Sequence, residues 1–386
     1  MVQIALAVTG KKRFKTCTAI ISPRKNIMDK NNKRMKILMT GVGGPTPRSF
    51  AIALKKYSHY KQFELFATDI NPLAIGLYQK ELFSKSFIVP RCTDEGYWEA
   101  INKIIQENNI EYAVILPELE VMEWSKQMEA GKLPCKALLP ASAMASLLVD
   151  KAKMTEVLQP LSIVPASVEF ERNETNLDKV YQTLGFPFWV RSTQGTSGLG
   201  SLKVENEAAL KNWVTINPGV NQFLASTFLP GRNLACKMLY FEGVLVRTAC
   251  GERVNYIMAK VAPSGITGNT SFGRLLNEPA LTAVAKKAMD HLFEYTNAKK
   301  HGFFTVDFKE DKEGKPYITE INVRHVAFTQ CFAAAGANFA EDTIRLIDGD
   351  GQFDKKYTMY EFEPGQIFLR DVDSLPVLMK EADLLK

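Results

Sequence analysis

The alternation of strand and helix patterns over residues 35–118 most constrains what this chain can fold into. Four short apolar segments have the composition of strands: 36-KILMT-40, 63-FELFATD-69, 86-SFIVP-90 and 111-EYAVILP-117. Helix patterns separate them, over Pro47–Tyr57, after Asn71-Pro72 and over 96-GYWEAINKIIQENN-109. This alternation predicts an α/β domain with a parallel sheet and right-handed helical crossovers.

The pattern changes after a predicted helix near residues 141–159. Strand-like segments become more frequent, at 187-PFWVRS-192, 201-SLKVE-205, 234-LACKMLYF-241 and 244-VLVRTAC-250. A helix with apolar residues at helical spacing follows, 281-LTAVAKKAMDHLFEYTNA-298, and then a hairpin over 302–322. The second part of the chain is therefore predicted to be α+β.

Charge is distributed unevenly along the 386 residues, a length that predicts two or three domains. The net charge is +6, but residues 1–34 hold nine Lys/Arg and one acid, Asp29, so the remainder carries −2. We therefore expect no nucleic-acid partner. No apolar run reaches the roughly 18 residues of a membrane span, so no membrane partner is expected.

The basic segment 1–34 has two interpretations, a targeting arm or a disordered extension. Its apolar stretch 4-IALAV-8 precedes the basic cluster 11-KKRFK-15, the reverse of the order in a signal peptide. We favour a disordered extension, or a mis-set start, ahead of a domain that begins at Met35. The six cysteines form no CxxC pair, and only four histidines are present, so reduced thiols in a cytoplasmic protein are expected.

The segment 303-FFTVDFKEDKEGKPYITEINVR-324 carries the strongest chemical signal. A turn at 312-KEGK-315 would pair residue 311 with 316 and 310 with 317, and the same register sets Asp307 opposite Glu320. Asn322 lies on the face of Glu320 because side chains alternate along a strand. Two facing carboxylates are destabilising unless a cation neutralises them, and oxygen ligands suit Mg²⁺.

The alternative is a solvated hairpin with ordinary surface acids, as Asp311 and Glu313 are expected to be. Polar Glu320, Asn322 and Arg324 alternate with apolar residues, and this favours a site. Arg324 could bind phosphate oxygens through two parallel hydrogen bonds.

A glycine-rich loop, 194-QGTSGLG-200, lies between two predicted strands. Its glycines would let backbone N–H groups turn toward phosphate, although such a turn is usually only a mobile hairpin. Arg191, three residues before the loop, and Lys151, at the start of a helix pattern, are candidate cations. A lone lysine in that place is normally solvated, so the loop and the cations carry weight only together.

Taken together, these elements resemble the ATP-grasp superfamily, within it the carbamoyl-phosphate-synthase-like, carboxylate–amine ligase branch. The resemblance runs from about Met35 to Asp348. Its motifs are GVGGP, 117-PELE-120, 150-DK-151, 185-GFPFWVRS-192, the glycine loop, 228-FLPGR-232, Asp307, 320-EINVR-324 and 336-GAN-338. It implies a Rossmann-like pre-ATP-grasp domain at 35–140, an ATP-grasp domain at 141–345 with a lid at about 160–228, and a C-terminal segment at 346–386.

The resemblance also implies roles for individual residues. Lys151 and Arg191 match the phosphate-binding cations, and Arg324 matches the arginine that steadies the transferred phosphate, so Arg191 and Arg324 are the catalytic candidates. Asp307, Glu320 and Asn322 match the ligands of Mg²⁺, for which Mn²⁺ is an alternative. The candidate ATP-binding residues also include the loop residues Gly195, Thr196, Ser197 and Gly198 and, near the adenosine, Ser226, Phe228, Leu229 and Asn233.

Three positions depart from the family pattern. Ser226 stands where the adenine-binding hinge usually begins with Glu, Asn233 replaces the usual ribose-binding acid, and Lys237 stands where an acid is frequent. Backbone groups read adenine in this family, and an Asn can still bond a ribose hydroxyl, so ATP binding is expected to survive.

The resemblance implies an ATP-dependent ligase that activates a carboxylate as an acyl phosphate, releases ADP and joins the acid to an amine. Small-molecule acids and amines are the expected partners, and the chain could form a homodimer. The segments 247–260 and 264–274 would border the acceptor site, where Arg253, Lys260 and Arg274 could hold a carboxylate, although each is more often a surface cation.

Two rival functions remain open. A nicotinamide-dependent oxidoreductase would use the turn 38-LMTGVGGPTP-47 and Asp69, and a non-catalytic protein would bind ATP without turnover. A dinucleotide fingerprint needs glycine at Thr46, and Pro45 and Pro47 remove N–H donors where pyrophosphate would lie. We therefore expect a tight strand-to-helix turn there, with Pro47 near the start of the helix.

Overall fold

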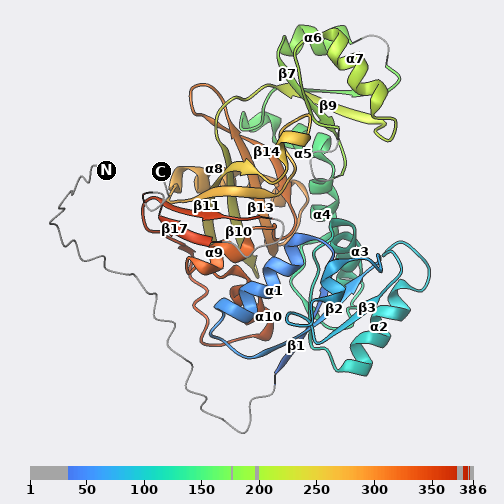
Figure 1. Ribbon diagram of the computed structural model, residues 1–386, viewed down its shortest axis with the longest axis vertical. Coiled ribbons are helices and arrows are strands. Elements are labelled where there is room, and N and C mark those ends of the chain that lie inside the picture. Colours follow the sequence, from blue (N-terminus) through green and yellow to red (C-terminus); the bar gives the residue numbers. More distant parts are fainter. Residues whose placement is uncertain (1–33, 175–176, 196–199, 372–376, 381, 383–386) are drawn as a thin grey trace, which may run out of the picture. The chain divides into compact units, whose positions relative to one another are not determined.

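The computed structural model describes residues 34–174, 177–195, 200–371, 377–380 and 382. Residues 34–386 form one compact unit, which contains three sheets. Among the described residues, no helix is both long enough and apolar enough to cross a membrane. The predicted domain boundaries within this unit stay a proposal, and the unit is described here sheet by sheet (Figure 1).

The N-terminal sheet is parallel, with strand order β3-β2-β1-β4-β5. Its strands are β1 (Met35–Thr40), β2 (Phe63–Asp69), β3 (Lys85–Ile88), β4 (Tyr112–Val114) and β5 (Lys136–Ala137). Residues alternate between two cores: Ile37 and Met39 pack with helix α1 (Pro45–Tyr57), whereas Leu38 packs with α2 (Tyr97–Asn108) and α3 (Glu118–Glu129). The predicted α/β fold is therefore confirmed for this part of the chain.

The central sheet is mainly antiparallel, with strand order β14-β13-β10-β11-β12-β16-β17. Its strands are β10 (Asn233–Phe241), β11 (Val244–Tyr256), β12 (Thr270–Leu276), β13 (Gly302–Glu310), β14 (Pro316–Asn322), β16 (Gln366–Leu369) and β17 (Val377–Lys380), and β15 (Thr358–Met359) pairs with β11. The C-terminal strands thus extend the β12 edge of the sheet.

Helices cover both faces of the central sheet. Helix α8 (Pro279–Tyr295) packs on the face that carries Cys236 and Met238 of β10. The other face, which carries Ala235 and Leu239, packs against α9 (Thr329–Ala334) and α10 (Phe339–Asp348). Lys237 belongs to this second face because side chains alternate along β10.

The third sheet has the order β6-β9-β7-β8. It lies within the predicted lid at about 160–228 and is called the lid sheet below. Its strands are β6 (Ser167–Glu171), β7 (Phe188–Ser192), β8 (Leu202–Val204) and β9 (Gln222–Thr227). Helices α6 (Asp178–Leu184) and α7 (Glu207–Ile216) share one apolar core with these strands and cover one face of the sheet (Figure 1). The chain enters the lid from α4 (Ser142–Val149) and α5 (Lys151–Leu158) through the short 3-10 helix η2 (Gln159–Leu161).

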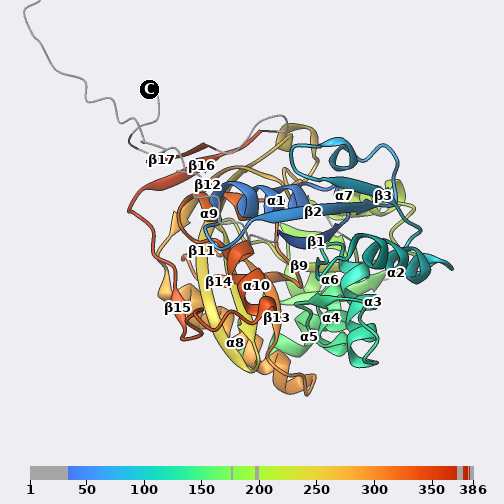
Figure 2. The same cartoon turned by 90° about the horizontal axis from the view of Figure 1, so that it is seen from below.

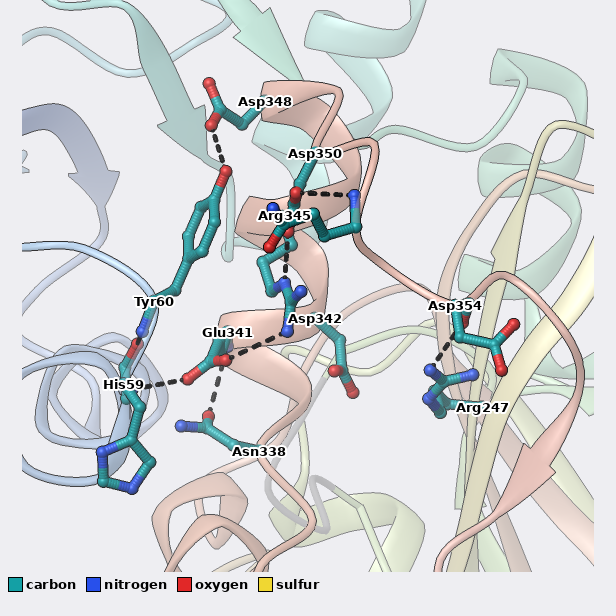
Figure 3. A network of polar contacts seen from close by, with 12 residues as sticks. His59, Tyr60, Arg247, Asn338, Glu341, Asp342, Arg345, Asp348, Asp350 and Asp354 are labelled. Carbon is teal, nitrogen blue, oxygen red and sulfur yellow. Dashed lines mark hydrogen bonds and ion pairs between the residues drawn. The ribbon is translucent and has the colours of Figure 1, made fainter.

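Polar contacts hold α10 against the loop after α1 (Figure 3). Glu341 accepts a hydrogen bond from the backbone of His59 at 2.8 Å, and Asp348 accepts from the Tyr60 hydroxyl at 2.5 Å. Arg345 joins Glu341 at 3.6 Å and Asp350 at 2.7 Å. The N-terminal sheet and the central sheet are thus joined by charged groups as well as by apolar packing.

Several predicted elements differ from the observed ones. The helix predicted after Asn71-Pro72 is only a short 3-10 helix, η1 (Ile75–Tyr78). Its Gly76 approaches Val42 so closely that a Cβ there would lie 2.2 Å from the Val42 carbonyl oxygen. The helix predicted near 141–159 is two helices, since Asp150 leaves helical geometry and caps α5 by accepting from the Lys153 amide. Another 3-10 turn, η3 (Ala259–Val261), lies between β11 and β12.

Candidate active site

A cavity of about 470 Å³ opens between the lid sheet and the central sheet. The lining includes residues of α5, of the strands β7 to β11, β13 and β14, and of the loops at 195, 228–229 and 264–268. The predicted site residues that line it are Lys151, Arg191, Gly195, Ser226, Phe228, Leu229, Asn233, Asp307 and Glu320. Residues from positions 151 to 320 thus meet in one place. Thr196, Ser197 and Gly198 lie outside the described residues.

The hairpin β13–β14 places Asp307 directly opposite Glu320, as predicted. The register near the turn is not the predicted one, because Glu310 pairs with Pro316 and not with residue 317. A bulge at Thr319 adds one residue to β14 and so restores the 307–320 pairing. The predicted pairing at the turn was therefore wrong, although the predicted carboxylate pair is correct.

Asp307 lies among charged groups of both signs. Its Oδ1 accepts from Arg253 Nη2 at 2.6 Å, and its Oδ2 accepts from Asn322 Nδ2 at 3.1 Å. Burial raises the pKa of Asp307 to about 6, against the opposing effect of Arg253, and Glu320 adds to the increase. The carboxylate pair therefore carries a cost in the folded chain, which a further cation would reduce.

Lys151 connects the helix α5 to both the loop and the carboxylate pair. Its ammonium group donates to the Gly195 carbonyl at 2.6 Å and lies 3.6 Å from Glu320 Oε1. The side chain is buried at the N-terminus of α5, where Asp150 provides the cap. This lysine is therefore not the solvated surface residue that its sequence position alone would suggest.

Arg191 of β7 also lines the site, on the side of the lid sheet. Its Nη2 donates to the Thr319 carbonyl at 2.6 Å, and its buried Nε has no hydrogen-bond partner among the described residues. Burial lowers the pKa of Arg191, with Glu320 acting in the opposite direction. Since Thr319 is the bulge residue, the same irregularity that aligns the carboxylates also presents a carbonyl to this guanidinium.

The remaining predicted nucleotide residues line one side of the cavity. Ser226 is buried in β9 between Ser167 and Trp189 of the neighbouring strands. Lys203 Nζ lies 4.7 Å from the centre of the Phe228 ring, and both residues line the cavity. Lys203 and Trp189 were not predicted, because a single sequence does not indicate which face of each lid strand is directed toward the cavity.

Two predicted residues lie behind the cavity lining. Asn322 is buried and donates a hydrogen bond to Asp307, which does line the cavity. Arg324 pairs with Glu118 Oε1 at 2.9 Å and donates to the His325 carbonyl at 3.1 Å. The arginine thus joins the hairpin to the start of α3, and the motif 117-PELE-120 contributes this contact.

The predicted acceptor cations separate into different environments. Arg253 is buried and paired with Asp307, so its expected surface position is wrong, whereas Lys260 is exposed. Arg274 pairs with Glu252 at 3.0 Å. The pairing of Arg253 with Asp307 required the register of three strands and could not be read from the sequence.

The turn Gly41–Gly44 makes its own hydrogen bonds. Gly43 N–H donates to Asp69 Oδ2 at 2.7 Å, Val42 N–H to the Thr68 carbonyl and Gly44 N–H to the Gly41 carbonyl. Gly41 has a φ of +66°, and a Cβ there would lie 2.5 Å from Pro117. The helix α1 begins at Pro45, two residues before the predicted Pro47. These amides are occupied, so the turn does not offer them to a pyrophosphate.

Comparisons with known proteins agree with this architecture. The chain is 23% identical over 216 residues to a D-alanine–D-alanine ligase of Neisseria meningitidis, covering 53% of this chain and 68% of that protein. The N5-carboxyaminoimidazole synthetase of Staphylococcus aureus, solved with ADP, matches with a TM-score of 0.66 at 17% identity, covering 88% of this chain and 83% of that one. No protein-family model matches the chain.

A third protein is similar over the same range. The biotin carboxylase domain of the Hydrogenobacter thermophilus 2-oxoglutarate carboxylase, solved with MgADP, ADP and bicarbonate, matches with a TM-score of 0.63 at 16% identity, covering 88% of this chain and 75% of that one. These similarities confirm the predicted architecture, a Rossmann-like domain followed by an α+β domain, and identify the chain as a protein with the ATP-grasp fold.

Proposed function

We propose that this chain is an ATP-dependent, ADP-forming ligase that activates a carboxylate as an acyl phosphate and joins it to an amine. The observation that carries the proposal is the convergence of two cations, Lys151 and Arg191, with the carboxylate pair Asp307 and Glu320 on one cavity. A nucleotide triphosphate needs such cations for its phosphates and a metal ion beside them.

The donor set of the hairpin fits a hard divalent cation. Asp307 and Glu320 supply carboxylate oxygens at the cavity, and Asn322 next to them supplies an amide whose oxygen becomes available when the group rotates. Mg²⁺ takes few protein ligands and completes its shell with phosphates and water, and Mn²⁺ accepts the same ligands. When bound, the ion would neutralise charge on the phosphates of ATP.

The chain's own groups would act mainly by binding and orientation. Lys151 and Arg191 would hold phosphate oxygens, and Ser226 to Leu229 with Asn233 would border the adenosine. A substrate carboxylate oxygen would attack the γ-phosphorus while the bond to ADP breaks. The amine nitrogen would then attack the acyl carbon, releasing inorganic phosphate and one proton. Neither step requires a protein nucleophile, so positioning and charge would provide the catalysis.

The similar proteins support this chemistry. Their names include a ligase that joins two D-alanines, and two of the solved structures hold ADP, one of them with magnesium. Arg324 would need to exchange Glu118 for a phosphate oxygen to take the role that the resemblance implies. Because Arg324 lies beside the hairpin, we include that role in the proposal.

An ADP-release screen tests the proposal. Purified full-length chain would be mixed with ATP, Mg²⁺ and each of a panel of amino acids and small carboxylates, with and without an amine partner. We expect ADP and phosphate to appear only where an acid, ATP and the metal are all present. Hydride transfer to NAD(P) would instead support an oxidoreductase. ATP binding without turnover across the panel would contradict the ligase proposal.

A further inference from the structure

Three arginines from separate elements lie near one another: two of them repel the third, and one contacts the Phe328 ring. They are Arg48 in the first turns of α1, Arg253 in β11 and Arg370 at the end of β16. Helix α1 packs against α9, which begins just after Phe328 (Figure 2). The N-terminal sheet, the central sheet and the C-terminal segment thus each contribute one guanidinium.

Contacts around Phe328 place these arginines. The Arg253 guanidinium lies 4.9 Å from the centre of the Phe328 ring. The Phe328 ring also stacks on Phe368, two residues before Arg370, with the ring centres 5.8 Å apart. Ser49, adjacent to Arg48, accepts a hydrogen bond from the Gln330 amide at 2.9 Å.

Two of these arginines have no carboxylate partner among the described residues, and each is held by a backbone carbonyl. Arg48 Nε donates to the Gly44 carbonyl at 3.3 Å and Arg370 Nη1 to the Thr270 carbonyl at 3.1 Å. Burial lowers the pKa of Arg48, and it lowers the pKa of Arg370 together with repulsion from Arg48 and Arg253. Half-buried guanidinium groups that repel one another are stabilised by an anion between them.

Two buried polar atoms near Phe328 also lack partners. Gln330 is 6% exposed, and its Oε1 has no hydrogen bond among the described residues. Arg253 is 9% exposed, and its Nε is equally without a partner, while its Nη2 is held by Asp307. Buried polar atoms normally have hydrogen-bond partners, so the unpaired donor Arg253 Nε indicates a bound acceptor. The Gln330 amide can rotate to present its NH₂ group, which would be a second donor to that acceptor.

We propose that Arg48, Arg370 and the unpaired edge of Arg253 bind an anionic group of the substrate, either a phosphate or a second carboxylate. Two guanidinium charges without a carboxylate partner match a ligand with two negative charges, carried either by one chemical group or by two. The position of Arg253 between this cluster and Asp307 makes it the link to the reacting end of the cavity. The assignment of this anion to a substrate rests on the proposed ligase function, whereas the binding of the anion does not.

Binding of two probe ions tests the site directly. The full-length chain, saturated with ADP, would be titrated calorimetrically with inorganic phosphate and with malonate at constant ionic strength, with chloride as the reference. The variant Arg48→Gln/Arg370→Gln removes both of these charges. Arg172→Gln is the matched control, because among the described residues Arg172 also donates to a backbone carbonyl, that of Val214, and it follows the lid strand β6.

We expect binding above that of chloride in the wild type and in Arg172→Gln. Affinity should fall about a hundredfold in the double variant, since each of the two charged hydrogen-bond partners removed contributes about a factor of ten. If the double variant does not fold, Arg48→Gln alone supplies the comparison. Tighter phosphate than malonate would identify a phosphate-bearing substrate, and the reverse a dicarboxylate.

Ion binding no stronger than that of chloride, or unchanged in the double variant, would overturn the proposal. The two proposals fail separately. An intact ion site with no ADP release in any mixture would reject the ligase function alone. ADP release from a chain that binds neither ion would reject the anion site alone.

Discussion

Asp307 of β13 and Glu320 of β14 face each other because a single extra residue, Thr319, corrects the register between them and the turn. Without the bulge, the pairing that begins at Glu310 and Pro316 would set residue 319 opposite Asp307. Successive side chains along a strand point to opposite faces. A shift of one residue in the register would therefore turn one carboxylate away from the other. The bulge carbonyl also holds Arg191.

The carboxylate pair should be required for turnover. Asp307→Asn and Glu320→Gln keep the shape of each side chain but remove the charge that holds a divalent cation. We expect each to lower kcat by at least about a hundredfold and to raise the Mg²⁺ concentration for half-maximal rate. Glu313→Gln, in the exposed turn of the same hairpin, is the control and should leave both quantities unchanged. Full activity in Asp307→Asn would reject the metal assignment.

Lys151 should contribute to nucleotide affinity through the phosphates. Lys151→Met removes the ammonium that now contacts Gly195 and Glu320, and we expect ATP to bind about ten- to a hundredfold more weakly. Adenosine, which lacks phosphates, should bind equally to both proteins in calorimetry. Lys153→Met is the matched control, since Lys153 lies on the same helix and pairs with Glu156 at the surface. Equal loss in the two variants would contradict a specific role.

Glu120 should make stability depend on pH. Burial raises the pKa of Glu120 to about 7, and one carboxylate oxygen lacks a partner in the described residues. The folded state then binds the proton more tightly than the unfolded state, so stability falls as pH rises from about 4.5 to 7. Glu120→Gln should stabilise the chain above pH 7 by at most roughly 3 kcal/mol, measured by urea unfolding.

The same urea series at pH 4 supplies the comparison for Glu120, because the wild-type carboxyl is protonated there. The advantage of Glu120→Gln should vanish at that pH. Glu99→Gln, an exposed residue of α2, should change stability little at either pH. A constant advantage across the pH range would show that Glu120 is not destabilising through its charge.

Lys237 should be a destabilising residue of the core. It is fully buried among Phe303, Phe328 and Phe332, whose ring centres lie 4.8–5.7 Å from its Nζ. Burial and Arg253 lower its pKa to about 7, so the unfolded state binds the proton more tightly above that pH. Lys237→Met should therefore raise the free energy of unfolding at pH 7 by on the order of 3 kcal/mol, less any cation–π energy lost.

The gain from Lys237→Met should shrink as pH rises from 7 toward 10, because the unfolded lysine then loses its proton as well. Thermal and urea unfolding at both ends of this range measure the difference. A loss of stability at pH 7 would mean that the three aromatic rings compensate the buried charge completely.

Local pattern sufficed to predict much of the fold and the centre of the site. The strand 63–69 matched β2. The predicted pairing of Asp307 with Glu320 was correct although the predicted turn register was wrong by one residue, because the Thr319 bulge offsets that error. The helix predicted after Asn71-Pro72 is only a short 3-10 helix, and the close approach of its Gly76 to Val42 is a tertiary contact that local pattern does not show. Likewise, the Thr319 bulge is invisible in sequence, since nothing in 316-PYITEIN-322 interrupts a strand pattern.

Contacts between distant elements account for what the sequence could not predict. Arg253 was expected at the surface, yet the registers of β10 with β11 and β13 bring it to Asp307. Arg48 and Arg370 are separated by more than 300 residues, and only the packing of α1 and β16 around α9 brings them together. Spacing along the chain contains no information about such neighbours.

Oxygen transfer from the acid to phosphate tests the central claim most directly. An accepted substrate would be labelled with ¹⁸O in its carboxylate and turned over with unlabelled ATP, Mg²⁺ and amine, and the released phosphate would be analysed by mass spectrometry. If the carboxylate attacks the γ-phosphate, one labelled oxygen should appear in each phosphate formed. Unlabelled phosphate, or label in AMP, would contradict an acyl-phosphate ligase.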